Sequence, residues 1–169
     1  MKPILNMVRQ AIEDKADFRL FKNVMPNTID LKSFQDRAKF FADSGDPHKI
    51  NGYRDELILD DYNKFKNIEN FLDEFLELDQ FKDNFYLTTI YSSPIWIDKP
   101  WSEYHNDNSI NISWQCHGSV EWKIGDESGP KETIVVEAGD VLYLKDFIYH
   151  STSVLSERAG IILMDKKTY

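Results

Sequence analysis

Residues 105–116 read HNDNSINISWQC. Polar side chains occupy the odd-numbered positions, whereas from residue 110 onward the even-numbered positions are apolar: Ile110, Ile112, Trp114 and Cys116. Alternation with a period of two is typical of a β-strand, because successive side chains point to opposite faces. His105 and Asp107 share the polar face. If this face lines a barrel, the strand is polar inside and apolar outside, the reverse of the ordinary pattern. The stretch therefore predicts a polar site inside a barrel, with N-terminal helices covering the apolar face.

The chain from residue 85 onward reads as a series of short strands separated by turns. We expect strands at Phe85–Ser92, Ile110–Cys116, Val120–Ile124, Thr133–Val136, Val141–Leu144, Ser151–Leu155 and Gly160–Met164. The segments between them are too short for helices, which excludes a parallel α/β sheet. Seven or eight short strands with such turns predict a mainly β fold, a sandwich or jelly roll.

The first half of the chain is mainly helical in pattern. Apolar residues recur at helical spacing over residues 31–41, behind Asp30 as a plausible N-cap. A longer amphipathic helix is predicted over residues 65–76, and a third over Ile4–Ile12. Residues 18–22 alternate as in a strand, and Ser44–Tyr53 has the turn residues of a loop. We therefore expect residues 1–84 to form a mostly helical buttress for a β core at 85–165.

Composition limits the classes of function. A chain of 169 residues predicts a single domain, 1–169, and 41% hydrophobic residues exclude intrinsic disorder. The net charge of −9 argues against binding nucleic acid. No apolar run is long enough to span a membrane, and the start resembles neither a signal nor a transit peptide. The single cysteine, Cys116, excludes an internal disulfide and favours a reducing, cytoplasmic location.

Three residues form a candidate metal site. His105 and Asp107 lie two apart on an extended chain and point the same way, and His150 follows the predicted strand at residues 141–144. Two imidazoles and one carboxylate form the facial triad suited to non-haem Fe(II). A His-x-acid triplet is common by chance, and the alternative is a solvated loop. The polar face of residues 105–115 favours the metal site.

The order of these residues resembles a small JmjC-type cupin oxygenase. The matching features are His-x-Asp, Gln115-x-x-Gly118, Trp122, and Gly139–Leu144 with a following His, within about residues 85–165. The resemblance implies a double-stranded β-helix that uses Fe(II), 2-oxoglutarate and O2 to hydroxylate a protein side chain or small metabolite. It also implies iron ligands at His105, Asp107 and His150, and 2-oxoglutarate contacts at Asn111 and Ser102.

One position departs from that family. The family usually has a lysine fifteen residues after the first histidine, or two residues later, to pair with the distal carboxylate of 2-oxoglutarate. Here these positions are Val120 and Trp122, and Lys123 has the wrong parity. Arg158 is the best substitute, ahead of Lys145. The alternatives are that Arg158 is a turn residue and that neutral groups hold the carboxylate, namely Ser102, Asn111 and a tyrosine (Tyr86 or Tyr91).

The remaining candidates have simpler interpretations. His48 and His117 lie in predicted turns, and Cys116 is expected to be buried packing. Trp96, Trp101 and Tyr104 precede the triad, where they either wall a substrate pocket or pack within the loop.

Two rival functions stay open at this point. One is a metal-binding cupin with chemistry independent of 2-oxoglutarate, which the missing lysine favours. The other is a non-enzymatic cupin that binds a small ligand in its polar interior. The primary substrate and the oligomeric state cannot be read from the sequence.

Overall fold

The computed structural model of the protein describes residues 3–25, 29–56, 68, 75–82 and 85–165. Their elements follow in the order α1 (Pro3–Glu13), β1 (Phe18–Phe21), α2 (Leu31–Asp43), η1 (Pro47–Asn51), β2 (Gly52–Glu56), β3 (Phe85–Ser92), η3 (Pro94–Trp96), β4 (Pro100–His105), β5 (Asn111–His117), β6 (Ser119–Asp126), β7 (Gly129–Glu137), β8 (Val141–Leu144), β9 (Tyr149–Val154) and β10 (Arg158–Asp165).

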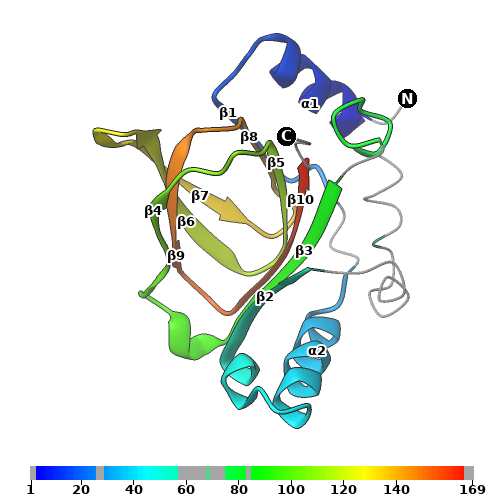
Figure 1. Ribbon diagram of the computed structural model, residues 1–169, viewed down its shortest axis with the longest axis vertical. Coiled ribbons are helices and arrows are strands. Elements are labelled where there is room, and N and C mark those ends of the chain that lie inside the picture. The colour runs from blue at the N-terminus through cyan, green and yellow to red at the C-terminus, as the bar shows by residue number, and fades with distance from the viewer. Residues whose placement is uncertain (1–2, 26–28, 57–67, 69–74, 83–84, 166–169) are drawn as a thin grey trace.

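The strands form two antiparallel sheets that face each other. The larger sheet has the order β1-β8-β5-β10-β3-β2, and the smaller has the order β4-β9-β6-β7. Figure 1 shows β4, β9, β6 and β7 on one side of the barrel and β10, β3 and β5 on the other. Consecutive strands alternate between the sheets along much of the chain, as in a jelly roll. The predicted mainly β, double-stranded β-helix fold with N-terminal helices is confirmed.

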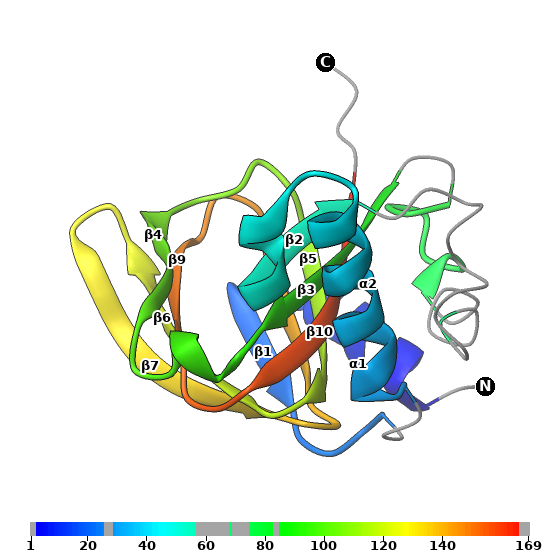
Figure 2. The same cartoon turned by 90° about the horizontal axis from the view of Figure 1, so that it is seen from below.

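The outer face of the larger sheet carries the main hydrophobic core. Ile112 and Trp114 of β5 belong to the same buried cluster as Leu5 of α1 and Phe34 of α2. Trp114 is only 1% exposed. Both views place the helices on the side of this sheet that faces away from the smaller sheet (Figure 2). The prediction that the apolar side of residues 110–116 faces outward, under the helices, is confirmed. Residues 105–116 do not form one strand, however, because His105 ends β4 of the smaller sheet and β5 of the larger sheet begins at Asn111.

The barrel interior has a smaller apolar cluster at one end. Its buried members come from β6, β7 and β8: Val120, Trp122, Ile124, Val136, Leu142 and Leu144. Lys123 has the opposite parity, as predicted: its side chain is 47% exposed and lies 3.8 Å from Glu121. The cation that the family usually has on this strand is thus absent from the inward-facing positions of β6.

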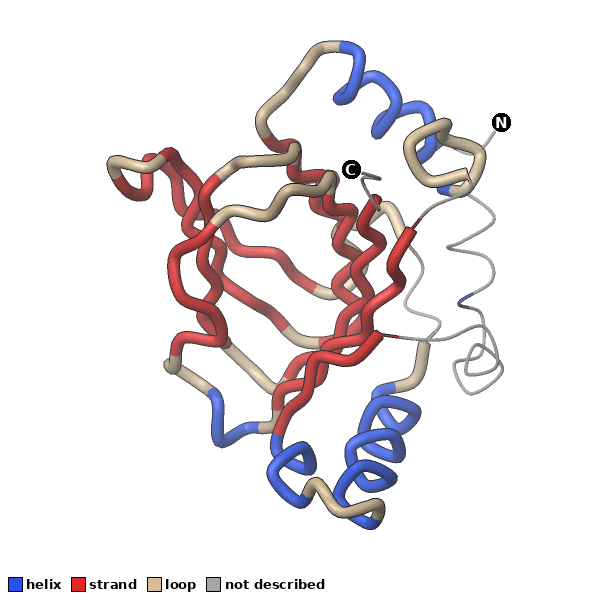
Figure 3. Tube along the Cα trace, viewed as in Figure 1, coloured by secondary structure: helices blue, strands red, loops and turns tan. Residues whose placement is uncertain are grey.

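Most local predictions are confirmed. Helix α2 begins behind Asp30, whose side chain accepts a hydrogen bond from the Lys32 backbone N–H at 3.1 Å. The segment Ser44–Tyr53 is not simply a loop, however, because η1 and the beginning of β2 lie within it. Strand β4 was also missed. Figure 3 shows the strands in the centre of the molecule and the helices at its edges.

The first half of the chain contributes strands as well as helices. Strand β1 pairs with β8, and β2 pairs with β3, both antiparallel. Most of the helix predicted over residues 65–76 lies outside the described residues. The division into a buttress and a core within one domain stays a prediction. Among the described residues, no helix is long and apolar enough to cross a membrane.

Candidate metal centre

The two histidines of the triad face each other across a strand pair. His105 ends β4 and His150 lies on β9, and the antiparallel register places them directly opposite. Their ring centroids are 4.5 Å apart. In each, Nδ1 lies close to the backbone carbonyl oxygen two residues earlier, at 2.7 Å for His105 and 3.0 Å for His150. An Nδ1–H that donates to this carbonyl leaves the Nε2 lone pair free, as in a metal-binding histidine.

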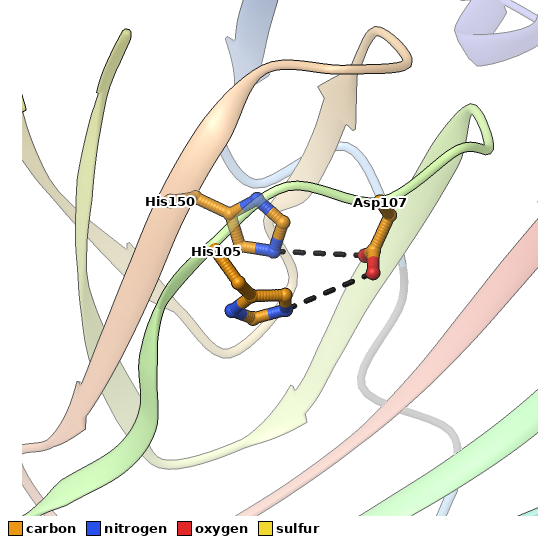
Figure 4. Close-up of side chains that lie close together, drawn as sticks. All are labelled: His105, Asp107 and His150. Carbon is orange, nitrogen blue, oxygen red and sulfur yellow. Dashed lines mark ion pairs between the residues drawn. The ribbon is translucent and has the colours of Figure 1, made fainter. Parts of the chain in front are cut away.

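Asp107 completes the group just beyond the end of β4. Its two carboxylate oxygens lie 3.7 Å from Nε2 of His105 and 3.7 Å from Nε2 of His150 (Figure 4). The Phe147 backbone N–H donates to the carbonyl of Asp107 at 2.8 Å. The side-chain amide of Asn111 donates to a carboxylate oxygen of Asp107 at 3.0 Å. One potential ligand atom from each of the three residues lies within 4.8 Å of the others, which fits a single metal ion.

Burial keeps His150 in the form that binds metal. Desolvation lowers its pKa, and electrostatic interaction with His105 and Arg54 lowers it further. The carbonyl of Ile148 and the carboxylate of Asp107 act in the opposite direction. The net effect favours the neutral imidazole at neutral pH, and neutral imidazole is the ligand form.

The triad opens into a pocket of about 250 Å³ between the sheets. This volume is just below the usual range for small-molecule sites, so it suits a compact ligand. The lining combines the triad, polar side chains, two arginines and an apolar wall: Arg54, Ile90, Trp101, Ser102, His105, Asp107, Asn111, Trp122, His150, Thr152, Arg158 and Ile162.

Arg158 is a buried cation in this pocket. It is the first residue of β10, not a turn residue, and is only 3% exposed. Its Nε donates to the Ser92 hydroxyl at 3.3 Å, and its guanidinium lies 5.5 Å from the centroid of the Trp101 ring. Burial lowers the pKa of Arg158 to about 9, which still leaves the side chain charged at pH 7. No ion pair joins it to a carboxylate of any described residue, and Asp107 is the one acidic residue in the pocket lining given above.

Two buried polar atoms beside the triad also lack hydrogen-bond partners in the described part of the chain. They are Oδ1 of Asn111 and the indole Nε1 of Trp122. Asn111 is 4% exposed and Trp122 is 5% exposed, and both side chains line the pocket. A buried polar group without a partner is costly, and at a functional site it indicates a ligand or water. Ser102 also lines the pocket, and its hydroxyl lies 3.0 Å from that of Thr152.

Other sequence candidates lie elsewhere. Tyr91 belongs to the outer core, and its hydroxyl donates to Glu157 at 2.8 Å, so it cannot serve the pocket. Lys145 lies 3.7 Å from Asp17 instead. Of the three aromatic residues before the triad, Trp101 lines the pocket. Trp96 packs edge-on against Trp101, and the Tyr104 hydroxyl donates to the Asp126 carbonyl at 3.1 Å.

Three other candidates are also outside the pocket lining. Tyr86 is 39% exposed, and His48 lies exposed on η1. Cys116 is completely buried in the outer core, where burial raises the pKa of its thiol, and this fits the expected packing role.

Arg54 is the charged pocket residue that sequence reasoning missed. It lies on β2, within the segment Ser44–Tyr53 and its continuation, for which the sequence predicts a loop and no strand pairing. The available signal was the alternation of Tyr53, Arg54 and Asp55 next to a turn. Trp122 was expected as a feature of the family resemblance and at a position where lysine is usual, but not as a pocket donor, although its indole N–H is itself a buried donor.

Comparison with known proteins supports the fold. No protein-family model and no curated protein sequence matches the chain. The structure of YcfD, a ribosomal oxygenase from Escherichia coli, in complex with cobalt and succinic acid is 15% identical over 95% of this chain, with a TM-score of 0.69. The same protein in complex with cobalt and 2-oxoglutarate is 14% identical over 95% of this chain, with a TM-score of 0.65.

The present chain spans about half the length of these two structures, 51% and 52% of their chains. The fold is a double-stranded β-helix similar to that of this ribosomal oxygenase. At this level of identity the similarity shows the fold alone, so the chemistry has to be argued from the pocket.

Proposed function

We propose that the protein is an Fe(II)- and 2-oxoglutarate-dependent oxygenase that hydroxylates a protein side chain or a small metabolite. The observation that carries this proposal is a buried cation, Arg158, without a carboxylate partner in the same pocket as the His105–Asp107–His150 group. A metal site by itself fits many cupins. A metal site with a buried unpaired guanidinium suits a ligand that is both a chelator and an anion.

The donor set fits a divalent iron. His105 and His150 offer Nε2 atoms, and Asp107 offers one carboxylate oxygen. Two imidazoles and one carboxylate with open positions are typical of non-haem Fe(II) oxygenases. Asn111 orients the Asp107 carboxylate, as outer hydrogen-bond partners of metal ligands commonly do. Bound iron and 2-oxoglutarate would supply the oxidising chemistry with O2, and the protein supplies binding and placement.

Arg158 fits the far end of a dicarboxylate. Its guanidinium can form two parallel hydrogen bonds with a carboxylate, and in a low-dielectric site such bonds are strong. Without an anion its burial is costly, because an isolated buried charge is destabilising by several kcal/mol. Ser102, Asn111 and Trp122 offer further hydroxyl, amide and indole groups to the same ligand. Ile90 and Ile162 form an apolar wall that limits water around it.

Other properties are assigned with the proposal. O2 is the co-reactant, the pocket binds small molecules rather than nucleic acid, and the single buried cysteine suits a cytoplasmic location. A protein side chain and a small metabolite are the two substrate classes to test.

The proposal is tested by anaerobic loading. Purified protein receives Fe(II), and 2-oxoglutarate is then added while the visible charge-transfer band of the chelate is recorded. We expect one iron per chain, a band that saturates with 2-oxoglutarate, and succinate formation when O2 is admitted. Asp107→Ala serves as the variant that should lose the iron and therefore the band.

Two results would contradict the proposal. Stoichiometric metal without a band or succinate formation would indicate a metal-binding cupin with chemistry independent of 2-oxoglutarate. Protein that binds no metal would indicate a non-enzymatic ligand-binding cupin.

A further inference from the structure

Arg54 is a second cation at the pocket, on the edge strand of the larger sheet. Strand β2 pairs with β3 so that Arg54 lies opposite Ile90, and both residues line the pocket. The neighbouring side chains have the opposite direction: Tyr53 is 2% exposed in the outer core, and Asp55 pairs with Arg37 of α2. Arg54 therefore faces the pocket because its neighbours are held on the other side of the strand.

Strand β2 also lies tightly against the pocket wall. A Cβ added at Gly52 would lie 2.8 Å from the ring of Trp101, so only glycine allows this approach. The Thr89 hydroxyl donates to the Asp55 carbonyl at 3.5 Å. With the Arg37–Asp55 ion pair, these contacts fix the strand that carries Arg54 at the mouth of the pocket.

The charge of Arg54 is not balanced by a described carboxylate. Its guanidinium Nη2 donates to the thioether sulfur of Met164 at 3.4 Å, a weak contact without charge. In contrast to Arg158, which is 3% exposed, Arg54 is exposed to solvent.

Charge balance separates the roles of the two arginines. A divalent metal, the Asp107 carboxylate, a dianionic 2-oxoglutarate and the Arg158 guanidinium together carry no net charge. The cosubstrate therefore needs Arg158 but leaves Arg54 as an excess positive charge at the mouth. A pocket of about 250 Å³ that already holds the cosubstrate leaves the primary substrate to enter at this mouth.

We propose that Arg54 binds an anionic group, a carboxylate or a phosphate, of the primary substrate and so selects acidic substrates. This inference rests on the proposed function and names the substrate class of the same site. The planar guanidinium fork matches both groups through paired hydrogen bonds. Since the chain carries a net charge of −9, attraction of an anion depends on such a local cation.

The test compares acids with matched neutral compounds. Protein loaded with redox-inert Zn(II) and saturating 2-oxoglutarate is titrated with phenylacetate and phenylacetamide, and with phenyl phosphate and phenol, by ligand-observed NMR. We expect each acid to bind at least tenfold more tightly than its neutral counterpart. Arg54→Gln should remove this preference and Arg54→Lys should keep part of it. Arg19→Gln, the same charge change on a residue 3.2 Å from Asp14, should leave it intact.

Three results would overturn the inference. The first is equal binding of the acid and the neutral compound, including no binding of either, and the second is a preference for the acid that survives in Arg54→Gln. The third is a tenfold weaker 2-oxoglutarate affinity in Arg54→Gln, which would make Arg54 an anchor of the cosubstrate. Failure of the proposed function is detected in a separate step, when 2-oxoglutarate does not bind to the metal-loaded protein. The acid–neutral comparison is then made on the Zn(II)-loaded protein. If the wild type prefers the acid and Arg54→Gln does not, Arg54 is still an anion-binding residue. If the wild type shows no preference for the acid, the inference is overturned.

Discussion

On the outer side of the larger sheet, Ile112 and Trp114 pack with α1 and α2 into the main hydrophobic core. On the inner side of the same strand, Asn111, Ser113 and Gln115 are also buried, yet they face a polar interior. The outer side stabilises the fold through apolar area, at roughly 25 cal/mol per Å² buried. Facing the same interior are the buried Arg158 guanidinium of β10 and polar atoms of Asn111 and Trp122 without hydrogen-bond partners among the described residues, an arrangement that is destabilising unless a ligand satisfies it. Along a strand such as β5, the residues that face outward therefore stabilise the fold, whereas the alternate residues that face inward border the candidate site.

The largest expected effect lies on the outer side. Trp114→Ala should destabilise the protein by about 3–5 kcal/mol, because it leaves a cavity in a well-packed core. Chemical denaturation measures this loss, and metal affinity measured under native conditions should change little. A loss of less than about 1 kcal/mol would show that the outer face does not carry the main core.

Removing the carboxylate ligand should separate binding from folding. Asp107→Ala should weaken metal binding at least a hundredfold, about 2.7 kcal/mol, since two histidines alone hold a divalent ion weakly. The free energy of unfolding of the metal-free protein should change by less than about 1 kcal/mol, because Asp107 lies in the polar site. Isothermal titration with Co(II) gives the affinity, with the exposed Asp36→Ala as the control. Metal binding equal to that of the wild type would remove Asp107 from the ligand set.

Arg158→Met tests whether the buried cation serves a ligand or the fold. The 2-oxoglutarate Kd of the metal-loaded protein should rise at least tenfold, about 1.4 kcal/mol, with metal binding unchanged. The melting temperature of the ligand-free protein should stay the same or rise, because an apolar side chain of similar length removes an unpaired buried charge. Arg19→Met is the matched control. A lower melting temperature with unchanged 2-oxoglutarate affinity would make Arg158 a structural residue.

The smallest effect is expected at Lys123, whose outward parity on β6 contrasts with the buried Trp122 beside it. Lys123→Ala should change the free energy of unfolding by less than about 0.5 kcal/mol, as is usual for exposed residues with weak ion pairs. The 2-oxoglutarate Kd should remain within twofold of the wild-type value. A tenfold higher Kd would show that this strand, and not Arg158, anchors the 2-oxoglutarate.

Period-two alternation by itself determined which side of β5 is polar, because neighbouring side chains of any strand point to opposite faces. The same reasoning placed Val120 and Trp122 inward and Lys123 outward on β6, as the structure confirms. The group His105, Asp107 and His150 was also predicted, from the two-residue spacing of the first two and from the position of His150 after the Gly139–Leu144 segment. The structure places His150 on the next strand, β9, and Asp107 just beyond the end of β4. Their roles as metal ligands remain the proposal to be tested.

Only the tertiary structure decided what surrounds this group. Strand β2 pairs with β3 across a separation of more than thirty residues, as in the register of Arg54 with Ile90. Arg37 of α2 holds Asp55 on the opposite face, so the direction of Arg54 depends on a helix and two strands together. Burial of Arg158 likewise results from packing against Ser92 and Trp101. Local periodicity indicates on which face of its own strand a side chain lies. Strand pairing and burial depend on contacts between distant segments. These contacts bring Arg54 to the pocket as its second cation and so determine the charge of the pocket.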